Sequence, residues 1–255
     1  MLRKRLIGTV VVRQGWAVQS FGFRRWLPLG RPECLVENLD RWGADGIAVL
    51  VIDRGDQGPD LALIKRLSAL GLSTPLTYGG GVYNEADAGA AVQAGAERLI
   101  LDTVLQIDPS AVQAMARIVG VQALVAALPL VSDAHGIVRH WLYRRREAVP
   151  ISDEVLRILA QETVSELLVI DTNGEGYGRG FEETLIDAIE PLTKLPLLAF
   201  GGLATSDQVH LLLNRPSCAG VLVGNSLNYR EHAIGHLKAN LTDLPLRPHS
   251  PRTTI

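Results

Sequence analysis

The stretch PLTYGGG at residues 75–81 has a near copy, PLLAFGG, at residues 196–202. Each stretch starts with proline, continues through a short apolar run and ends in consecutive glycines. A short run without polar alternation is typical of a parallel strand that is buried on both faces. Glycines directly after such a strand permit a tight turn. The two stretches therefore predict two equivalent strand–loop units about 120 residues apart.

Similar apolar runs recur along the whole chain, and amphipathic helical patterns alternate with them. Eight strands and eight helices in strict alternation indicate a barrel or a doubly wound sheet, and the number eight favours the TIM, or (β/α)₈, barrel. A length of 255 residues suits one such α/β domain, which we expect over residues 1–243, followed by a disordered tail over residues 244–255. The expected strands are 6–12, 46–52, 75–78, 98–101, 121–128, 166–170, 196–200 and 219–223; the expected helices are 32–42, 60–70, 84–94, 109–119, 152–163, 182–190, 206–214 and 230–241.

The repeat extends beyond the glycine stretches. Residues 51–53 and 169–171 both read Val-Ile-Asp, and the strand end at 99–103 corresponds to the one at 221–225. This pattern predicts a barrel built from two half-barrel repeats of four strand–helix units each. Every strand-end feature would then occur twice, on opposite sides of one mouth, an arrangement that suits a ligand with two anionic ends.

Composition narrows the class of function. A formal net charge of −2 argues against nucleic-acid binding, which needs a basic face. The basic amino terminus is followed by an apolar run too short and interrupted for a signal peptide or a membrane span, so we expect a cytoplasmic protein. Cys34 and Cys218 are far apart and are expected to be buried thiols. His232 and His236 lie four residues apart without a third ligand, so neither a metal nor a cofactor is predicted.

In this fold the functional groups lie at the carboxyl ends of the strands. Glycines there let backbone N–H groups approach a phosphate, and a following helical turn adds partial positive charge. The alternative is that the glycines only form tight turns. The candidate phosphate-binding residues are Gly80, Gly81, Gly201, Gly202, Gly224 and Asn225.

Asp53 and Asp171 end two strands. Either could transfer protons or bind hydroxyls in the mouth, or cap its own loop. Asn173 and Gly174 follow Asp171 and are candidate phosphate donors. The run at 144–146, three arginines, is expected to be a solvated face, and the alternative is that it binds an anion. Trp16 and Trp26 either line the mouth or pack against the barrel.

Several segments resemble the cyclase subunit of imidazole glycerol phosphate synthase over about residues 1–230. They are residues 1–7, the hairpin around Gly15, 43–45, 75–81, 95–97 and 199–202. The resemblance implies a two-phosphate ribonucleotide across the mouth and a glutaminase partner at the opposite, N-terminal face. It also implies ammonia passage through the barrel, past a ring of charged residues. Arg5, Arg98 and Glu166 match that ring, while Gly46, next to Asp45, takes its fourth position. The alternative is an ordinary charge network on the stability face.

The departures from the family pattern concern its chemistry. The two catalytic aspartates of the family fall on Val11 and Pro129, which cannot transfer a proton, and the hairpin lysine falls on Gln19. The strand-two aspartate falls on Val51, with Asp53 two residues on.

The phosphate-binding asparagine of the family falls on Asp102, next to Thr103. A carboxylate repels a phosphate dianion unless it is protonated or bridged by a cation. The resemblance thus implies that the second phosphate site is intact and that the first is altered.

Three functions fit these residues. The favoured one is a cyclase-like barrel that binds a phosphorylated substrate, receives ammonia from a glutaminase and serves sugar amidation, as divergent barrels of surface polysaccharide synthesis resemble this chain. The second is a true cyclase of histidine biosynthesis that uses Asp53, Asp102 and Asp171 as acids and bases. The third is a non-catalytic barrel that binds a phosphorylated metabolite.

Overall fold

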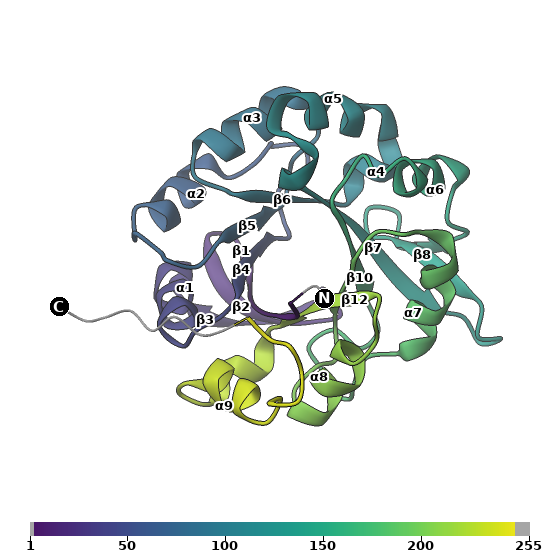
Figure 1. Cartoon of the computed structure of the whole chain (residues 1–255). Helices are drawn as coiled ribbons and strands as arrows, with labels where there is room; N and C mark the ends of the chain where they lie inside the picture. Colours follow the sequence, from purple (N-terminus) through teal and green to yellow (C-terminus); the bar gives the residue numbers. More distant parts are fainter. Residues whose placement is uncertain (1–2, 248–255) are drawn as a thin grey trace.

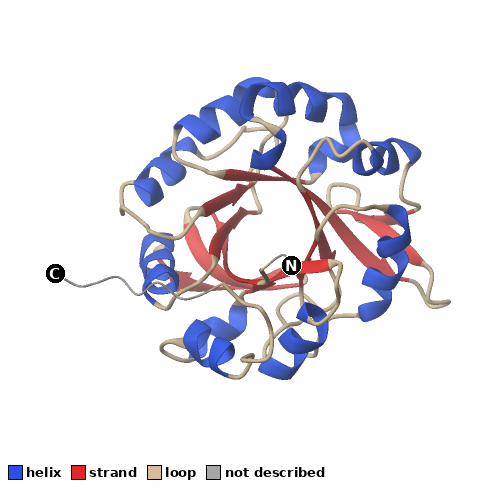
Figure 2. Cartoon of the chain, in the orientation of Figure 1, coloured by secondary structure: helices blue, strands red, loops and turns tan. Residues whose placement is uncertain are grey.

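The structure, a computed structural model, describes residues 3–247. Its centre is a closed barrel of parallel strands, because the last barrel strand pairs with the first (Figure 1). The helices form a ring outside the strands (Figure 2). The predicted TIM barrel is therefore confirmed. Around the barrel the strands are β1 (Arg5–Arg13), β4 (Gly46–Val51), β5 (Leu76–Gly79), β6 (Arg98–Leu101), β7 (Leu124–Ser132), β10 (Glu166–Asp171), β11 (Leu197–Phe200) and β12 (Cys218–Val223).

All eight predicted helices are present, with ends that differ by up to three residues. The sequence did not predict α4, which follows β6 directly. The predicted start of β7 was too early, because residues 121–123 form a 3₁₀ turn. The helices are α1 (Pro32–Arg41), α2 (Leu61–Ser68), α3 (Glu85–Gln93), α4 (Thr103–Ile107), α5 (Pro109–Val119), α6 (Asp153–Ala160), α7 (Glu183–Ile189), α8 (Ser206–Leu213) and α9 (Ala233–Ala239), and the 3₁₀ segments are η1 (Val121–Ala123), η2 (Glu190–Leu192) and η3 (Asn225–Tyr229).

Strand alternation sorts the barrel side chains into two sets. On β1, Leu6 and Val10 pack outward in the larger core under the helices, whereas Ile7 faces the barrel interior. On β10, Leu167 and Val169 face outward. The inward set is almost wholly apolar and fills the barrel as a column: Ile7, Ala48, Leu50, Ile100, Val125, Ala127, Leu168, Ile170, Leu198, Phe200 and Leu222. Thr77, paired with Ala48, is a polar residue at an inward position of β5, and the charged side chains at the strand starts lie below the column.

Two hairpins extend from the mouth. The first, β2 (Trp16–Phe21) and β3 (Arg25–Gly30), follows β1; the second, β8 (Val138–Leu142) and β9 (Glu147–Val149), follows β7. Their tips meet at Phe23 and Tyr143, whose ring centroids are 5.4 Å apart, and Phe23 also packs on the interior column. The hairpins thus close the column at the mouth.

Each hairpin also contacts a loop of the opposite half of the chain. The Gly22 N–H of the first hairpin donates to the Glu175 carbonyl, in the loop after β10, at 2.9 Å. Arg144 of the second hairpin donates to both carboxylate oxygens of Asp56, in the loop after β4, at 2.9 and 3.1 Å. Arg144, one of the three arginines expected to form a solvated face, therefore links the second hairpin to the loop after β4 across the mouth. We call this link and the Gly22–Glu175 link the straps.

Other expectations are corrected in detail. Cys34 is exposed, so only Cys218 is a buried thiol as predicted. Trp16 and Trp26 neither line the cavity described below nor pack inside, and the Arg13 guanidinium stacks over Trp26.

Side chains cap some of the helices that follow barrel strands. Asn84 caps α3 and Thr205 caps α8, whereas the side chain of Asp108 makes no cap bond to α5.

Both ends of the described chain run side by side. Lys4 forms a β-bridge with Leu246, and the Lys4 N–H donates to the Pro245 carbonyl at 3.0 Å, so residues 244–247 are ordered. The remainder of the predicted tail, 248–255, lies outside the described residues. Within residues 3–247, no helix is long and apolar enough to cross a membrane.

Candidate functional site

A cavity of about 310 Å³ opens at the carboxyl ends of β1, β11 and β12, beside the first hairpin. Its walls are mostly apolar side chains and glycine-rich loops, as expected for a small-molecule site. Phe200 and Leu222 belong both to its wall and to the interior column, so the top of the column forms the cavity floor. Predicted residues that line it are Gly201, Gly202, Gly224 and Asn225.

The glycine pair after β11 is required by its backbone. Gly201 and Gly202 have φ of 122° and 71°, and a Cβ on Gly201 would lie 2.5 Å from the Asp171 carbonyl oxygen. The Gly180 N–H donates to the Gly202 carbonyl at 2.9 Å. The loops after β10 and β11 therefore lie in direct backbone contact, which any side chain at these glycines would disturb.

Asn225 shapes the cavity wall through its side chain. Its amide accepts from the Ser20 N–H at 3.2 Å and donates to the Ser20 and Gly176 carbonyls at 2.7 and 3.2 Å. The side chain thus ties the first hairpin to the loop after β10. Only its backbone remains for a ligand.

The loop after β10 contributes different residues from those predicted. The Gly174 N–H donates to Asp171 Oδ1 at 2.7 Å, and the exposed Asn173 is not part of the cavity wall. Instead Gly176 and Gly178 line the cavity. The alternating glycines at 174–180 were the available signal, but without a register they did not indicate which N–H groups were already bonded.

Thr9 and Val11 project from β1 toward the cavity. Thr9 is 6% exposed, and its Oγ1 has no hydrogen-bond partner within the part of the chain that the structure describes. Val11 gives that wall an apolar surface at the position where the resemblance implies a catalytic aspartate. Pro129 is buried opposite Ile170. Neither replacement brings a titratable group to these two strand ends.

Asp171 does not reach the mouth. It follows the outward-facing Val169 by two residues, and its carboxylate accepts from the Gly174 and Glu182 N–H groups at 2.7 and 3.1 Å. Burial raises its pKa, while these backbone bonds lower it. Asp171 therefore caps its own loop.

Asp53 is also a backbone acceptor, and it is not the structural counterpart of Asp171. Its Oδ2 accepts from the Gln14 N–H at 2.7 Å. A Cβ on Gly80 would meet the Val51 carbonyl, as one on Gly201 would meet that of Asp171. The repeat alignment at Val-Ile-Asp is therefore wrong by two residues, because the strands β4 and β10 match from their first residues.

Asp102 is the predicted carboxylate that does lie at the mouth. It follows the inward-facing Ile100 by two residues, and its Oδ1 accepts from Gln106 Nε2 at 3.0 Å. Gln106 Nε2 also lies 3.2 Å from Nε2 of the buried His140. Burial raises the pKa of Asp102 to about 7 and lowers that of His140 to about 4. A neutral imidazole can accept the second N–H of Gln106, so the three side chains form one chain of contacts.

The first half has the same glycine geometry but different surroundings. Gly80 and Gly81 have φ of 132° and 71°, nearly the values of their counterparts. Nearby, the Arg54 guanidinium donates to the Gly58 carbonyl at 2.7 Å, and Tyr83 donates to the Gly55 carbonyl at 2.6 Å. Thr103 starts α4 beside Asp102. In this half of the mouth, the side chains of Arg54 and Tyr83 thus bond to carbonyls of the loop after β4.

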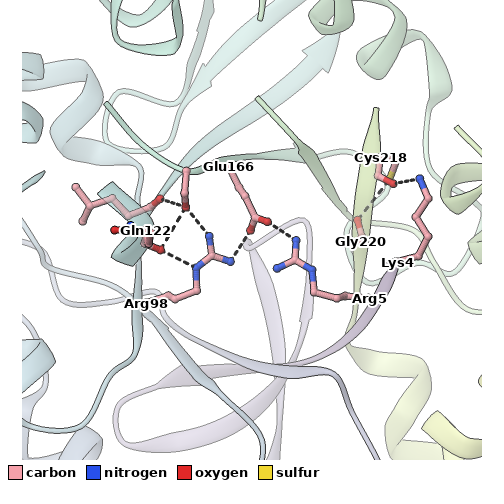
Figure 3. A network of polar contacts seen from close by, with 9 residues as sticks. Lys4, Arg5, Arg98, Gln122, Glu166, Cys218 and Gly220 are labelled. Carbon is pink, nitrogen blue, oxygen red and sulfur yellow. Dashed lines mark hydrogen bonds and ion pairs between the residues drawn. The ribbon is translucent and has the colours of Figure 1, made fainter. Parts of the chain in front are cut away.

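At the opposite end of the column, Arg5 and Arg98 both pair with Glu166 (Figure 3). All three come from strand starts on separate strands, and their side chains are 10–20% exposed. Arg98 also donates to Ser165 Oγ at 2.6 Å. The predicted ring residues therefore meet, forming what we call the charge cluster.

The fourth ring position supplies no charge. Gly46 has no side chain, and neighbouring Asp45 accepts from Lys238 at 2.6 Å and from the Leu6 N–H at 2.8 Å. Lys4 likewise turns away, to the Cys218 and Arg215 carbonyls. The charge cluster thus consists of two cations and one anion.

No group of three potential metal ligands is found in residues 3–247. The fold and its cavity place the chain in the class of TIM barrels that carry a candidate site at the carboxyl ends of the strands. A model of the histidine biosynthesis protein family matches residues 5–233, and the chain belongs to that family.

Its relatives include imidazole glycerol phosphate synthase subunits. The chain is 29% identical to subunit HisF of Exiguobacterium sibiricum, over 82% of this chain and 84% of that protein. It is 27% identical to subunit HisF of Geobacillus thermodenitrificans, over 95% and 98%. It is 24% identical to a putative subunit hisF2 of Vibrio vulnificus, over 96% and 91%. The recognised resemblance to the cyclase subunit is thereby confirmed.

Proposed function

We propose that this chain is the synthase-side barrel of a glutamine-dependent amidotransferase. It holds a phosphorylated small molecule in the cavity and receives ammonia from a separate glutaminase docked at the N-terminal face. The observation that carries this proposal is the arrangement along one axis: the charge cluster lies at one end of the apolar column and the cavity lies at the other.

The interior column suits neutral ammonia. Its lining includes the small residues Ala48 and Ala127, and Gly79 and Gly220 occupy inward positions on their strands. An apolar path excludes ammonium, because an unpaired ion loses its hydration there, whereas ammonia loses far less. Glu166 can release one arginine while keeping the other, which would open the N-terminal end. Phe23 closes the upper end and would have to move as the hairpins shift.

The cavity suits a phosphate held by backbone groups. Glycine-rich loops from β10, β11 and β12 surround it, and they leave room for N–H groups to approach an anion. Among residues 3–247, its one charged lining residue is Glu175, whose carboxylate accepts from Ser20 Oγ and the Phe23 N–H, both at 3.0 Å. These hydrogen bonds point the Glu175 carboxylate toward the first hairpin rather than toward a phosphate in the cavity.

The class of molecule that accepts the nitrogen is inferred from the absence of acidic side chains at positions 11 and 129. Val11 and Pro129 cannot perform the proton transfers that the family cyclase assigns to these positions, and loss of general acid–base groups costs about 10²–10⁴ in rate. We therefore assign the barrel to amidation of a sugar or related metabolite rather than to ring closure.

The names of the relatives favour a second candidate, a cyclase of histidine biosynthesis. Its proton transfers would depend on Asp102, because the carboxylates of Asp53 and Asp171 accept hydrogen bonds from backbone N–H groups of loops. The third candidate, a non-catalytic barrel, leaves the charge cluster without a purpose beyond stability.

The decisive experiment is to capture the partner with the tagged chain from native extract and to assay glutaminase activity on the captured material. We expect the activity to rise when the chain binds. Arg98→Ala should weaken that rise, and Arg145→Ala, on the exposed second hairpin at the opposite end of the barrel, should not. A folded chain that captures no glutaminase would contradict the proposal, and a rise retained by both variants would exclude a role for the charge cluster.

The acceptor is tested separately with ¹⁵N-ammonium in place of glutamine. Label recovered in a phosphorylated or nucleotide-linked sugar supports the assignment. Formation of imidazole glycerol phosphate would instead establish the cyclase candidate.

A further inference from the structure

The two halves of the mouth have equivalent glycine loops, but one half is suited to bind an anion and the other presents a carboxyl group. The loops after β5 and β11 adopt the same backbone conformation, as the φ angles of their glycine pairs indicate. The half at β11 and β12 adjoins the cavity and presents backbone groups. The half at β5 and β6 presents the Asp102 carboxyl at the corresponding strand end.

We propose that the ligand of this barrel is anionic at one end only. Its phosphoryl end lies in the loops after β11 and β12, and its other end, toward β5 and β6, carries no phosphate. This inference rests on the proposed function and specifies its substrate class.

The charged groups around the ends of β5 and β6 support a ligand that is anionic at one end only. Asp102 accepts from the Gln106 amide rather than from a cation, and that amide in turn lies 3.2 Å from Nε2 of His140. Arg54 donates to the Gly58 carbonyl, Arg144 pairs with Asp56 at the surface, and Arg24 stacks over Trp141. Burial raises the pKa of Asp102 to about 7, so the ionised carboxylate gains population as the pH rises above neutrality. A phosphate there would be repelled by the ionised carboxylate.

The straps across the mouth support it as well. The Arg144–Asp56 contact joins the second hairpin to the loop after β4, and so spans the strand ends of β5 and β6. Tyr83, after β5, donates to Gly55 in the same loop. A phosphate at this half would have to displace these contacts.

Thr9 is an independent sign that a polar ligand group enters the cavity. Its hydroxyl is more than nine-tenths buried, faces the cavity floor and has no partner in residues 3–247. Burying an unpaired hydroxyl is unfavourable, and a hydrogen bond to a ligand hydroxyl or carbonyl would remove that cost. Thr9 lies beside Gly224, so the group it binds is close to the phosphoryl end.

The test is calorimetric titration at pH 8 with ribose 5-phosphate and ribulose 1,5-bisphosphate as probes. The wild type should bind the monophosphate about tenfold more tightly, the effect of roughly 1.4 kcal/mol of repulsion. Asp102→Asn should remove most of this preference by strengthening bisphosphate binding. Asp108→Asn, an exposed carboxylate at the far end of α4, is the matched control and should change neither affinity.

A second pair of variants tests the cavity floor. Thr9→Val should weaken monophosphate binding about tenfold without lowering the melting temperature, because no internal hydrogen bond is lost. Thr9→Ser should restore binding. Equal binding by Thr9→Val would exclude a ligand contact at this hydroxyl.

The outcomes separate the two proposals. If neither ester nor inorganic phosphate binds the wild type, the phosphate cavity and with it the proposed function are wrong. If the bisphosphate binds as tightly as the monophosphate and Asp102→Asn changes neither, the cavity stands and the one-ended ligand is wrong.

Discussion

Replacing Glu166 by glutamine should destabilise the barrel strongly, although the change removes no heavy-atom volume. The side chain is 10% exposed and is the shared anion of Arg5 and Arg98, which are 12% and 20% exposed. Glu166→Gln leaves two cations facing one another at the end of an apolar column. We expect a loss of about 3 kcal/mol, the lower end of the range for a broken buried pair, because some solvent reaches the cluster.

The assay is thermal and urea unfolding followed by circular dichroism. A loss of about 3 kcal/mol corresponds to a melting temperature lower by about 6–12 °C in a chain of this size. Glu147→Gln is the control, since Glu147 pairs with Arg145 at the surface, where both side chains are about half exposed or more. That variant should stay within about 0.5 kcal/mol of the wild type.

A triple variant separates charge from packing. Arg5→Met, Arg98→Met and Glu166→Leu together remove every charge of the cluster, and stability should return to near the wild-type value or above it. Equal melting temperatures for Glu166→Gln and Glu147→Gln would refute the reasoning, because they would mean that water already solvates the two arginines.

Four further outcomes follow from the structure. Asp102→Asn should melt higher than the wild type at pH 8 but not at pH 4, because a pKa raised from 3.8 to about 7 gives stability that is present below pH 3.8 and lost as pH rises through 7. His140→Gln should blunt acid unfolding, since a pKa lowered from 6.5 to about 4 removes stability as pH falls through that range; the urea midpoint against pH checks both. Gly201→Ala should cost at least about 2 kcal/mol in urea unfolding, because the added Cβ meets a carbonyl at positive φ. A thiol reagent should titrate Cys34 in the native protein and reach Cys218 only after unfolding, since burial raises the pKa of that thiol to about 11.

The sequence was sufficient to predict the barrel because strands buried on both faces are continuous apolar runs. All eight were located, and the ring residues Arg5, Arg98 and Glu166 were found because a resemblance aligned them at strand starts. Strand starts have a fixed register, so inward and outward positions follow from simple alternation.

The candidate site was predicted less well because loops do not keep that alternation. Asp53 and Asp171 looked equivalent in sequence, yet only a backbone register shows that the counterpart of Asp171 is Val51. Thr9 carries no motif, and its unpaired hydroxyl is visible only when its neighbours are known. The helix α4 was hidden because it directly follows β6 with no loop between.

The two hairpins have a consequence for how this chain folds. The first belongs to the amino-terminal half of the chain and holds Glu175 in the other half, while the second reaches back to Asp56. Each half is therefore completed by residues that lie 88 or 155 positions away in the sequence, and contacts at such high sequence separation form slowly. Expressed as two separate polypeptides split between β6 and β7, the halves should be poorly ordered alone and should recover a native fold by complementation, each supplying the strap that the other lacks.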